Sequence, residues 1–328
     1  MRAAIIGANG LEIADVATPE IKSHQILTRV HYAALNRADL AIAAGHKHGG
    51  AGGAGAIAGL EWSGEVVAVG SDVTEYKPGD LVMCSGAGGY AEFAVSDLSR
   101  TNPLPRTTSP DNGYDLKEAA TFPVALQTMH DAIVTNGGLQ AGESVLILGA
   151  SSGVGIIGMQ IARALGAKTV IGTSTDEAKL PELTRFGADL AINTRDPDWA
   201  DQVLAATDGK GVNLIVDQVS GGTINAAMKA CALLGRIVNV GRLGGMKGEF
   251  DFDLHARKRI QYTGVTFRTR NFEEVLAINL AMRRDLWAAL EQRQFELPIN
   301  RVFPLEEAAQ AQAYMAENRH FGKILLAI

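Results

Sequence analysis

The sequence predicts an α/β protein with two domains, one rich in β-strands and one built on a doubly wound parallel sheet. The chain of 328 residues is long enough for two domains of about 150 residues each. Short apolar runs broken by glycine and polar turns fill the chain up to about Asn102, and from about Asp115 strands and helices alternate. Repeated β-α-β units imply a parallel sheet that helices cover on both faces.

Short strands are predicted in the first part of the chain. Alternating and β-branched residues indicate strands at 26–30, 65–69, 81–84 and 91–95. Residues 77–80, Lys-Pro-Gly-Asp, form a turn that leads into the third of these strands. Residues 49–59 are nearly all Gly and Ala, with few side chains to bury, which predicts a mobile surface loop.

The middle of the chain is predicted to alternate strands with helices. We expect strands at 144–148, 168–172, 191–193, 213–217, 236–240 and 261–267, and helices at 156–165, 176–186, 198–206 and 223–230. Two long helices at 272–293 and 305–317 and a strand at 323–328 then break the rhythm. We therefore expect one domain of residues 1–118 with 268–328 and an inserted domain of residues 119–267.

Composition and charge exclude several classes of protein. With 47% hydrophobic and 20% charged residues, the chain is not of the disordered class. Two cysteines, Cys84 and Cys231, are too few for a disulfide framework or a four-thiolate zinc site. A net charge of -6 without a basic stripe argues against nucleic acid as a partner. No apolar run approaches a membrane span of about 20 residues, and no export signal is visible, so we expect a cytoplasmic protein.

The glycine-rich turn after the strand at 144–148 carries the clearest functional signal. Gly153, Gly155 and Gly158 form a G-x-G-x-x-G pattern between a strand and a helix. Such a turn lets the backbone approach a pyrophosphate and aims free N–H groups and the helix dipole at it. The alternative is a tight packing turn, which the strand–turn–helix context makes less favoured. We expect a dinucleotide to bind at Ser152, Gly153, Val154 and Gly155.

The end of the second strand indicates which dinucleotide binds. NAD-selective sites place an acidic side chain here, whereas Ser174 is small and neutral and leaves room for a 2′-phosphate. Lys179 and Arg195 are candidate cations, although most single Lys or Arg residues are solvated. Asp176 argues the other way, because its carboxylate would oppose a phosphate. We expect NADPH, with Ser174, Thr175 and Lys179 at its 2′-phosphate end.

Motifs typical of one family run along nearly the whole chain. They are ALNRAD at 34–39, GLEWSGEV at 59–66, KPGD at 77–80, GYAE at 89–92, SGVG at 152–155, GRLGG at 241–245, RTR at 268–270, RVFPLEEA at 301–308 and HFGKI at 320–324. In this order they resemble the medium-chain dehydrogenase/reductases, in the zinc-free quinone oxidoreductase branch. The resemblance implies a GroES-like β-rich catalytic domain, a Rossmann NADPH-binding domain, a site in the cleft between them, and a homodimer joined at the strand 261–267.

The resemblance also assigns site residues. Zinc-dependent relatives carry a Cys where this chain has Asn36 and a His where it has Leu60, and leucine cannot ligate zinc, so no metal is expected. Asn36 is placed beside the nicotinamide ribose or the substrate, although by itself it could be a turn residue. Without zinc ligands beside it, Glu61 is expected to be a structural hydrogen-bonding residue. The further cofactor contacts implied are Thr128, Thr194 (a tyrosine in many relatives), Gly241, Leu243 and Lys323.

Without a metal to polarise a carbonyl, the natural reaction is hydride transfer to a quinone or to the C=C bond of an α,β-unsaturated carbonyl compound. Hydrogen-bond donors or water must then stabilise the charge that develops on a remote oxygen. His46 and His48 are candidate proton donors; alternatively, both are solvated loop residues. Two other functions stay open: an enoyl-thioester or haloacrylate-type enoyl reductase, and a crystallin-like NADPH-binding protein with little catalysis.

Overall fold

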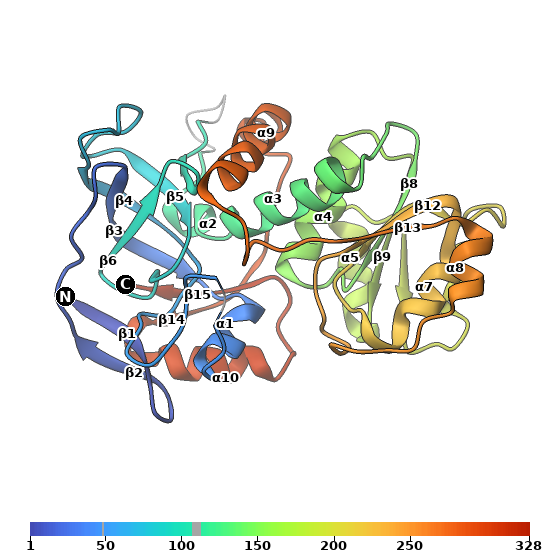
Figure 1. Ribbon diagram of the computed structural model, residues 1–328, viewed down its shortest axis with the longest axis horizontal. Coiled ribbons are helices and arrows are strands. Elements are labelled where there is room, and N and C mark those ends of the chain that lie inside the picture. The colour runs from blue at the N-terminus through green and yellow to red at the C-terminus, as the bar shows by residue number, and fades with distance from the viewer. Residues whose placement is uncertain (48, 107–112) are drawn as a thin grey trace. The chain divides into compact units, whose positions relative to one another are not determined.

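The computed structural model describes residues 1–47, 49–106 and 113–328. These residues divide into two compact units (Figure 1). One contains Met1–Val124, Phe267–Arg293 and Leu297–Ile328, and the other contains Ala125–Thr266 with Gln294–Glu296. No helix in the described part of the chain is long and apolar enough to cross a membrane. The α/β class predicted from the sequence is confirmed.

The first unit is built on a mixed sheet in which strands from both ends of the chain are neighbours. Within the described residues this sheet has seven strands, in the order β14-β15-β3-β4-β5-β7, with β6 paired to β3. Their bounds are β3 Gln25–Ala34, β4 Glu61–Val69, β5 Leu81–Ser85, β6 Phe93–Asp97, β7 Thr101–Pro103, β14 Ile299–Pro304 and β15 Lys323–Ala327. Because β15 pairs antiparallel with β3, the last strand of the chain brings Lys323 into this unit.

A hairpin at the N-terminus was not among the predicted elements. β1 (Arg2–Gly7) and β2 (Gly10–Asp15) pair antiparallel.

The segment 49–59 packs against β1: the Ile6 N–H donates to the Ala56 carbonyl over 2.9 Å, and the Ala58 N–H donates to the Ala4 carbonyl over 2.9 Å. Ala51 and Ala58 are buried. The prediction of a surface loop is therefore wrong for Ala51 and for residues 56–58, where small residues allow the two backbones to approach each other, whereas Gly49, Gly50, Ala54 and Gly55 are exposed.

Helices and an apolar core complete the first unit. The helices are α1 Arg37–Ala43, α2 Leu116–Ala119, α9 Phe272–Glu291 and α10 Ala308–Ala316, the last preceded by a 3-10 turn at Leu305–Glu307. Asn271 caps the start of α9: its side chain accepts the Glu274 N–H over 2.9 Å. The core includes Trp62, Tyr90, Phe303 and Leu326. α3 (Pro123–His130) begins in this unit and continues into the second, followed by a π-helix at Asp131–Asn136.

The second unit, all of whose residues are described, contains a parallel sheet of six strands in the order β10-β9-β8-β11-β12-β13. The bounds are β8 Ser144–Leu148, β9 Thr169–Ser174, β10 Leu190–Asn193, β11 Val212–Asp217, β12 Cys231–Asn239 and β13 Gln261–Gly264. Numbered from β8 the order is 3-2-1-4-5-6, which is that of a Rossmann fold. In such sheets ligands bind outside the carboxyl ends of the strands, where the strand order reverses. Here this point lies between β8 and β11.

Helices connect these strands and cover the sheet (Figure 1). They are α4 Gly153–Ala164, α5 Leu180–Arg185 after a 3-10 turn at Glu177–Lys179, α6 Trp199–Ala205, α7 Ile224–Ala230 after a 3-10 turn at Gly221–Thr223, and α8 Phe252–Lys258. Trp199, Val203 and Met228 pack with Leu146 and Ile237 in one buried cluster. β13 ends at Gly264, so the strand predicted at 261–267 is shorter than expected.

Candidate functional site

The turn after β8 presents the start of α4 at the carboxyl edge of the parallel sheet. Ser152 caps the helix: its Oγ accepts the Gly155 N–H over 3.0 Å and lies 3.0 Å from Gln218 Oε1. Gln218 Nε2 in turn donates to the Leu148 carbonyl over 3.1 Å. The N–H groups of Gly153 and Val154, the first two of a helix, have no acceptor within that helix. The turn therefore has the donors and the dipole that an anion requires.

Packing within the protein also favours glycine at two positions of the motif. A Cβ added at Gly155 would lie 2.6 Å from Ala150 Cα, and one added at Gly158 would lie 2.9 Å from Met129 Sδ. The start of α4 thus lies directly on the turn that follows β8, and Gly158 lies against α3. At Gly155 the crowding atoms are backbone, so glycine is required there whether or not a cofactor binds; at Gly158 the neighbour is the flexible end of the Met129 side chain, which can shift.

Hydroxyl groups from neighbouring strands gather at the end of β9. Ser174 is buried; its Oγ lies 3.2 Å from Ser151 Oγ and accepts the Asp176 N–H over 3.1 Å. Thr194, which follows β10, donates its N–H to the Ser174 carbonyl over 3.0 Å. Ser151 was not predicted, and its position becomes evident only when β8 and β9 are side by side. The strand end thus offers neutral hydroxyls at the position of an NAD-selective carboxylate.

The cations near this strand end are Lys179 and Arg195. Lys179 Nζ lies 3.7 Å from Asp176 Oδ2, while Asp176 Oδ1 accepts the Ala178 N–H over 3.1 Å and so caps the 3-10 turn. Arg195 and Thr175 are exposed. Asp176 therefore has a structural role in the turn, and it competes for Lys179 with any phosphate.

The ends of β11 and β12 carry a buried polar group that the sequence analysis missed. Asp217 Oδ1 accepts the N–H groups of Val219 and Ser220, both over 2.8 Å, and burial raises the pKa of Asp217. The Leu243 N–H donates to the Gln218 carbonyl over 3.2 Å, and the Leu243 side chain is exposed. The sequence did contain a signal for this group, namely a polar residue that ends an apolar strand: Asp217 ends β11, and Asn239 ends β12.

A buried charged group lies in the first unit. The Lys323 ammonium pairs with Glu61 Oε1 and donates to Asn36 Oδ1 over 2.9 Å. Asn36 Nδ2 donates to Glu61 Oε1 over 2.9 Å, and Glu61 Oε2 accepts the Val124 N–H at the start of α3 over 2.9 Å. Both polar atoms of the Asn36 amide are thus engaged inside the group. Glu61 is the structural hydrogen-bonding residue that the sequence suggested.

Asp39 and Tyr90 extend this group. Asp39 Oδ2 accepts the Tyr90 hydroxyl over 2.8 Å and the Asn36 N–H over 2.7 Å. Asp39 Oδ1 is buried and has no hydrogen-bond partner within the described residues. Burial raises the pKa of Asp39 to about 7, and it also raises the pKa of Glu61 in spite of the neighbouring Lys323 ammonium.

The donor set around Asn36 does not suit a metal ion. Leu60 cannot ligate, and the Lys323 ammonium already binds the oxygens of Asn36 and Glu61. A second positive charge at this place would be repelled. In residues 1–47, 49–106 and 113–328, no group of three or more His, Cys, Asp or Glu side chains is placed to hold a metal ion.

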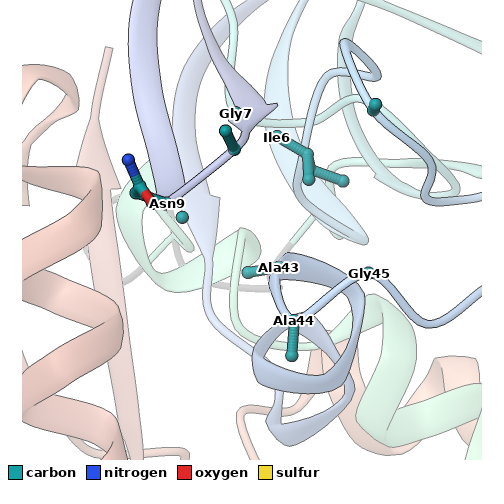
Figure 2. A pocket seen from close by; sticks show the side chains of 9 residues that line it. Ile6, Gly7, Asn9, Ala43, Ala44 and Gly45 are labelled. Carbon is teal, nitrogen blue, oxygen red and sulfur yellow. The ribbon is translucent and has the colours of Figure 1, made fainter.

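The remaining predicted residues do not join a common site within either unit. His46 is exposed after α1, and His48 lies outside the described residues, so its assignment stays a prediction. A surface hollow of about 500 Å³ lies beside this segment (Figure 2). It is lined by Ile6, Gly7, Ala8, Asn9, Gly10, Ala43, Ala44, Gly45 and Ala54. Asn9 is its polar side chain, and an amide is no proton donor for catalysis. Thr128 is half-buried on α3.

Comparisons with known proteins agree with this architecture. Residues 153–281 match a family model described as zinc-binding dehydrogenase, and residues 22–106 match the alcohol dehydrogenase GroES-like domain. The quinone oxidoreductase of Rattus norvegicus is 30% identical over 315 residues, 95% of this chain and 92% of the relative. A quinone oxidoreductase structure from Pseudomonas syringae covers 100% of both chains at 25% identity, with a TM-score of 0.86.

A relative of another kind is a much longer protein. It belongs to the phenolphthiocerol/phthiocerol polyketide synthase of Mycobacterium tuberculosis and is 30% identical over 330 residues. The match takes in 98% of this chain but 14% of that protein. The chain is therefore similar to one part of a much larger protein as well as to whole quinone oxidoreductases.

Proposed function

Because this chain belongs to the medium-chain dehydrogenase/reductases, in the quinone oxidoreductase branch, we propose that it is an NADPH-dependent reductase that transfers hydride to quinones or to the C=C bond of α,β-unsaturated carbonyl compounds. It is an oxidoreductase with a Rossmann domain of the nicotinamide dinucleotide-binding type. The observation that carries the choice of NADPH is the end of β9. Ser174, Ser151 and Thr194 are neutral there, and Lys179 supplies a positive charge.

The residues of the second unit fit a dinucleotide. The first N–H groups of α4 suit a pyrophosphate, and the hydroxyls of Ser151 and Ser174 suit a ribose 2′-phosphate that Lys179 would neutralise. Gly241 and Leu243 would border the cofactor from the loop after β12. When bound, NADPH supplies the hydride.

Zinc takes no part in the reaction that we propose. The Lys323 ammonium, held by Glu61 and Asn36, supports this, because it places a fixed positive charge among the oxygens that would otherwise be available as ligands beside Leu60. Activity should survive prolonged chelation and should not rise when Zn²⁺ is added back. Loss of activity on chelation with recovery in Zn²⁺ contradicts the proposal.

Water supplies the proton in the proposed reaction. His46 is exposed, and the polar groups of Asn36, Glu61 and Lys323 are engaged by one another and by the backbone of Leu35 and Val124. His46→Ala and His48→Ala should each change kcat by less than about threefold, whereas loss of a general acid typically costs about 10² or more. A large loss in either variant assigns the proton to that histidine.

Steady-state kinetics test the proposal directly. NADPH and NADH are each assayed against a panel of quinones, enones and enoyl thioesters. We expect turnover of a quinone or enone, with kcat/KM for NADPH at least about tenfold above that for NADH, the factor that one extra contact of roughly 1.4 kcal/mol provides. Preference for NADH contradicts the assignment of the β9 end.

An enoyl-thioester reductase is the second candidate. The similarity to part of a polyketide synthase supports it. Enoyl thioesters turned over much faster than quinones and enones would favour this function. Tight NADPH binding without turnover of any class would instead favour a crystallin-like binding protein. We further propose that the protein is a cytoplasmic homodimer without nucleic acid or membrane partners.

A further inference from the structure

Ser220 has a backbone conformation that is nearly restricted to glycine. It follows β11 at the carboxyl edge of the sheet, with φ 58° and ψ -150°. Arg259 also has a positive φ, but with ψ 43° it lies in the ordinary left-handed region. A non-glycine residue with the angles of Ser220 is strained and persists only where its surroundings impose the conformation. Glycine at this position would remove the strain, so the serine side chain must contribute something that glycine cannot.

The Ser220 hydroxyl joins the ends of neighbouring strands. Its Oγ donates to the Gly241 carbonyl over 2.8 Å and accepts a hydrogen bond from Asn239 Nδ2 at the end of β12. Asp217 Oδ2, at the end of β11, lies 3.4 Å away. The side chain is buried, with 8% of the residue exposed. One hydroxyl thus links the end of β11 with the end of β12 and with Gly241 after it.

The loop that this hydroxyl holds lies directly on the backbone beside Ser220. The Gly244 N–H donates to the Val219 carbonyl over 2.7 Å. A Cβ added at Gly221 would lie 2.4 Å from the Gly244 carbonyl oxygen. No side chain separates the two segments, so a shift at Ser220 passes straight into the loop that carries Gly241 and the exposed Leu243.

We propose that Ser220 is a positioning residue, whose hydroxyl holds the loop 241–245 in the place that cofactor binding requires. This inference rests on the proposed function, in which the second unit binds NADPH. The strained backbone is retained because the glycine that would relieve it lacks the hydroxyl. Ser220 acts on the cofactor through Gly241 and does not touch it.

Two variants separate positioning from a merely structural role. Ser220→Gly removes the hydroxyl and relieves the strain, whereas Ser220→Ala removes the hydroxyl and keeps the strain. Dissociation constants for NADPH are measured by nicotinamide fluorescence, and Tm is measured in the same buffer without cofactor. We expect both variants to raise Kd about fivefold or more, as loss of one buried hydrogen bond would, although Ser220→Gly is the more stable of the two.

Leu234→Gly is the matched control. Leu234 also has a positive φ, 61°, but its side chain is exposed within β12, where the register with β11 shifts. The control relieves strain in the same unit and should leave Kd unchanged. In turnover assays, KM for NADPH should rise in both Ser220 variants while KM for the quinone does not.

The outcomes are distinct. Unchanged Kd in both Ser220 variants, with wild-type protein that binds NADPH, overturns this inference alone. A Kd that rises in Ser220→Ala but not in Ser220→Gly also overturns it, since affinity would then follow stability. Wild-type protein that binds neither NADPH nor NADH overturns the proposed function and this inference with it.

Discussion

Lys323 is buried to an extent that is rare for a lysine. Its side chain is 3% exposed, and lysines are almost never buried so far unless they are paired. The Glu61 carboxylate, the Asn36 amide oxygen and the Leu35 carbonyl at 3.5 Å replace the water that the ammonium has lost. Removing one partner of a buried pair leaves an uncompensated charge, which is the costly case. The group should therefore show a strong energetic coupling.

Lys323→Met tests this coupling. The variant leaves Glu61 buried without its cation, so we expect the free energy of unfolding to fall by about 3–5 kcal/mol. Adding Glu61→Gln should recover part of that loss, because the uncompensated charge is removed. The measurement is urea denaturation of the wild type, both single variants and the double variant. Lys229→Met, which breaks the exposed pair with Asp201, is the control and should cost less than about 1 kcal/mol. Equal losses in Lys323→Met and the control would contradict the coupling.

Asp39 should give the stability a pH dependence of definite sign. Burial raises its pKa to about 7 in the folded protein, against about 3.9 in an unfolded chain. Between these values the folded state binds more protons than the unfolded state, so the free energy of unfolding falls as pH rises. Asp39→Asn keeps an acceptor for Tyr90 and does not titrate. Relative to this variant, the free energy of unfolding of the wild type should fall by up to roughly 4 kcal/mol between about pH 4 and pH 8.

The comparison is the difference in unfolding free energy between wild type and Asp39→Asn at several pH values in that window. Asp253→Asn, at a largely exposed carboxylate, serves as the control and should show a difference that hardly varies with pH. A constant difference for Asp39→Asn as well would show that the carboxyl does not titrate in this range.

The choice between NADPH and NADH should depend on three side chains at the end of β9. Ser174→Asp places a carboxylate where the 2′-phosphate is proposed to bind, and two like charges about 4 Å apart repel by roughly 1–4 kcal/mol. That corresponds to about one to three decades of affinity against NADPH. Lys179→Ala should weaken NADPH and leave NADH nearly unchanged. Asp176→Asn should strengthen NADPH, since it releases Lys179 from its competing partner.

The measurement is kcat/KM for both cofactors in the wild type and the three variants. If Ser174→Asp lowered kcat/KM for NADPH and for NADH equally, the substitution would act by distorting the strand end and not by repelling the 2′-phosphate. An unchanged preference in Asp176→Asn would show that its carboxylate does not compete for Lys179.

At the level of elements, sequence pattern predicted those that have a local signal. Most strands and helices of the Rossmann sheet were predicted within a few residues, because each is an apolar run or an amphipathic period between turn residues; β12 departs most, since it begins at Cys231 and was predicted from residue 236. α8 was missed because none of its residues is buried, so it has no apolar period. β14 was missed because it ends in Pro304 and is defined by its register with β15, which no local pattern reveals.

The candidate site divides in the same way. The turn at 152–155 was predicted because its signal is local. Ser151 and Ser220 were not, because their partners lie on strands that are neighbours only in the folded sheet. Lys323 and Glu61 are 262 residues apart in the sequence. The family motifs that contain them indicated that each lies near a site, but the ion pair between them could not be predicted.

The contact between α4 and the turn after β8 can be tested at Gly155. Gly155→Ala puts a Cβ 2.6 Å from Ala150 Cα, so we expect a loss of about 1–3 kcal/mol in the free energy of unfolding, typical of overpacking. Gly222→Ala has open space around the new Cβ and should change stability by less than about 0.5 kcal/mol. Both are measured by urea denaturation without cofactor. If Gly155→Ala were as stable as the wild type, the glycine would be needed only to let a ligand approach the backbone.

On the scale of the whole molecule, neither unit is a continuous stretch of chain. The chain passes between the units at 124–125, 266–267, 293–294 and 296–297. The sheet of the first unit needs β14 and β15, which come last in the sequence, beside β3, which comes early. That sheet cannot be completed until the whole chain is present, so truncation after the Rossmann sheet removes strands from the other unit.

The open edge of the parallel sheet is where we propose that two copies join. β13 is the last strand in the sheet order and pairs with β12 on one side. Tyr262 on this strand is exposed, as are the nearby Phe252 and Met246, at 76% and 79%. An unpaired strand edge is a template for pairing, and a two-fold axis through it gives a closed, isologous contact.

Gly264→Pro tests the homodimer at that edge. The Val265 N–H donates to Asn239 of β12 over 2.9 Å, so the alternation along a strand turns the Gly264 N–H toward the open side. Proline removes this donor without breaking a bond to β12, and we expect the mass in light scattering at micromolar concentration to fall from that of a dimer to that of a monomer. Gly264→Ala is the matched control: the new Cβ meets nothing within 4 Å, and the N–H stays, so the dimer should persist. A wild type that is already monomeric, or a proline variant that stays dimeric while folded, would mean that copies of this chain do not join through β13.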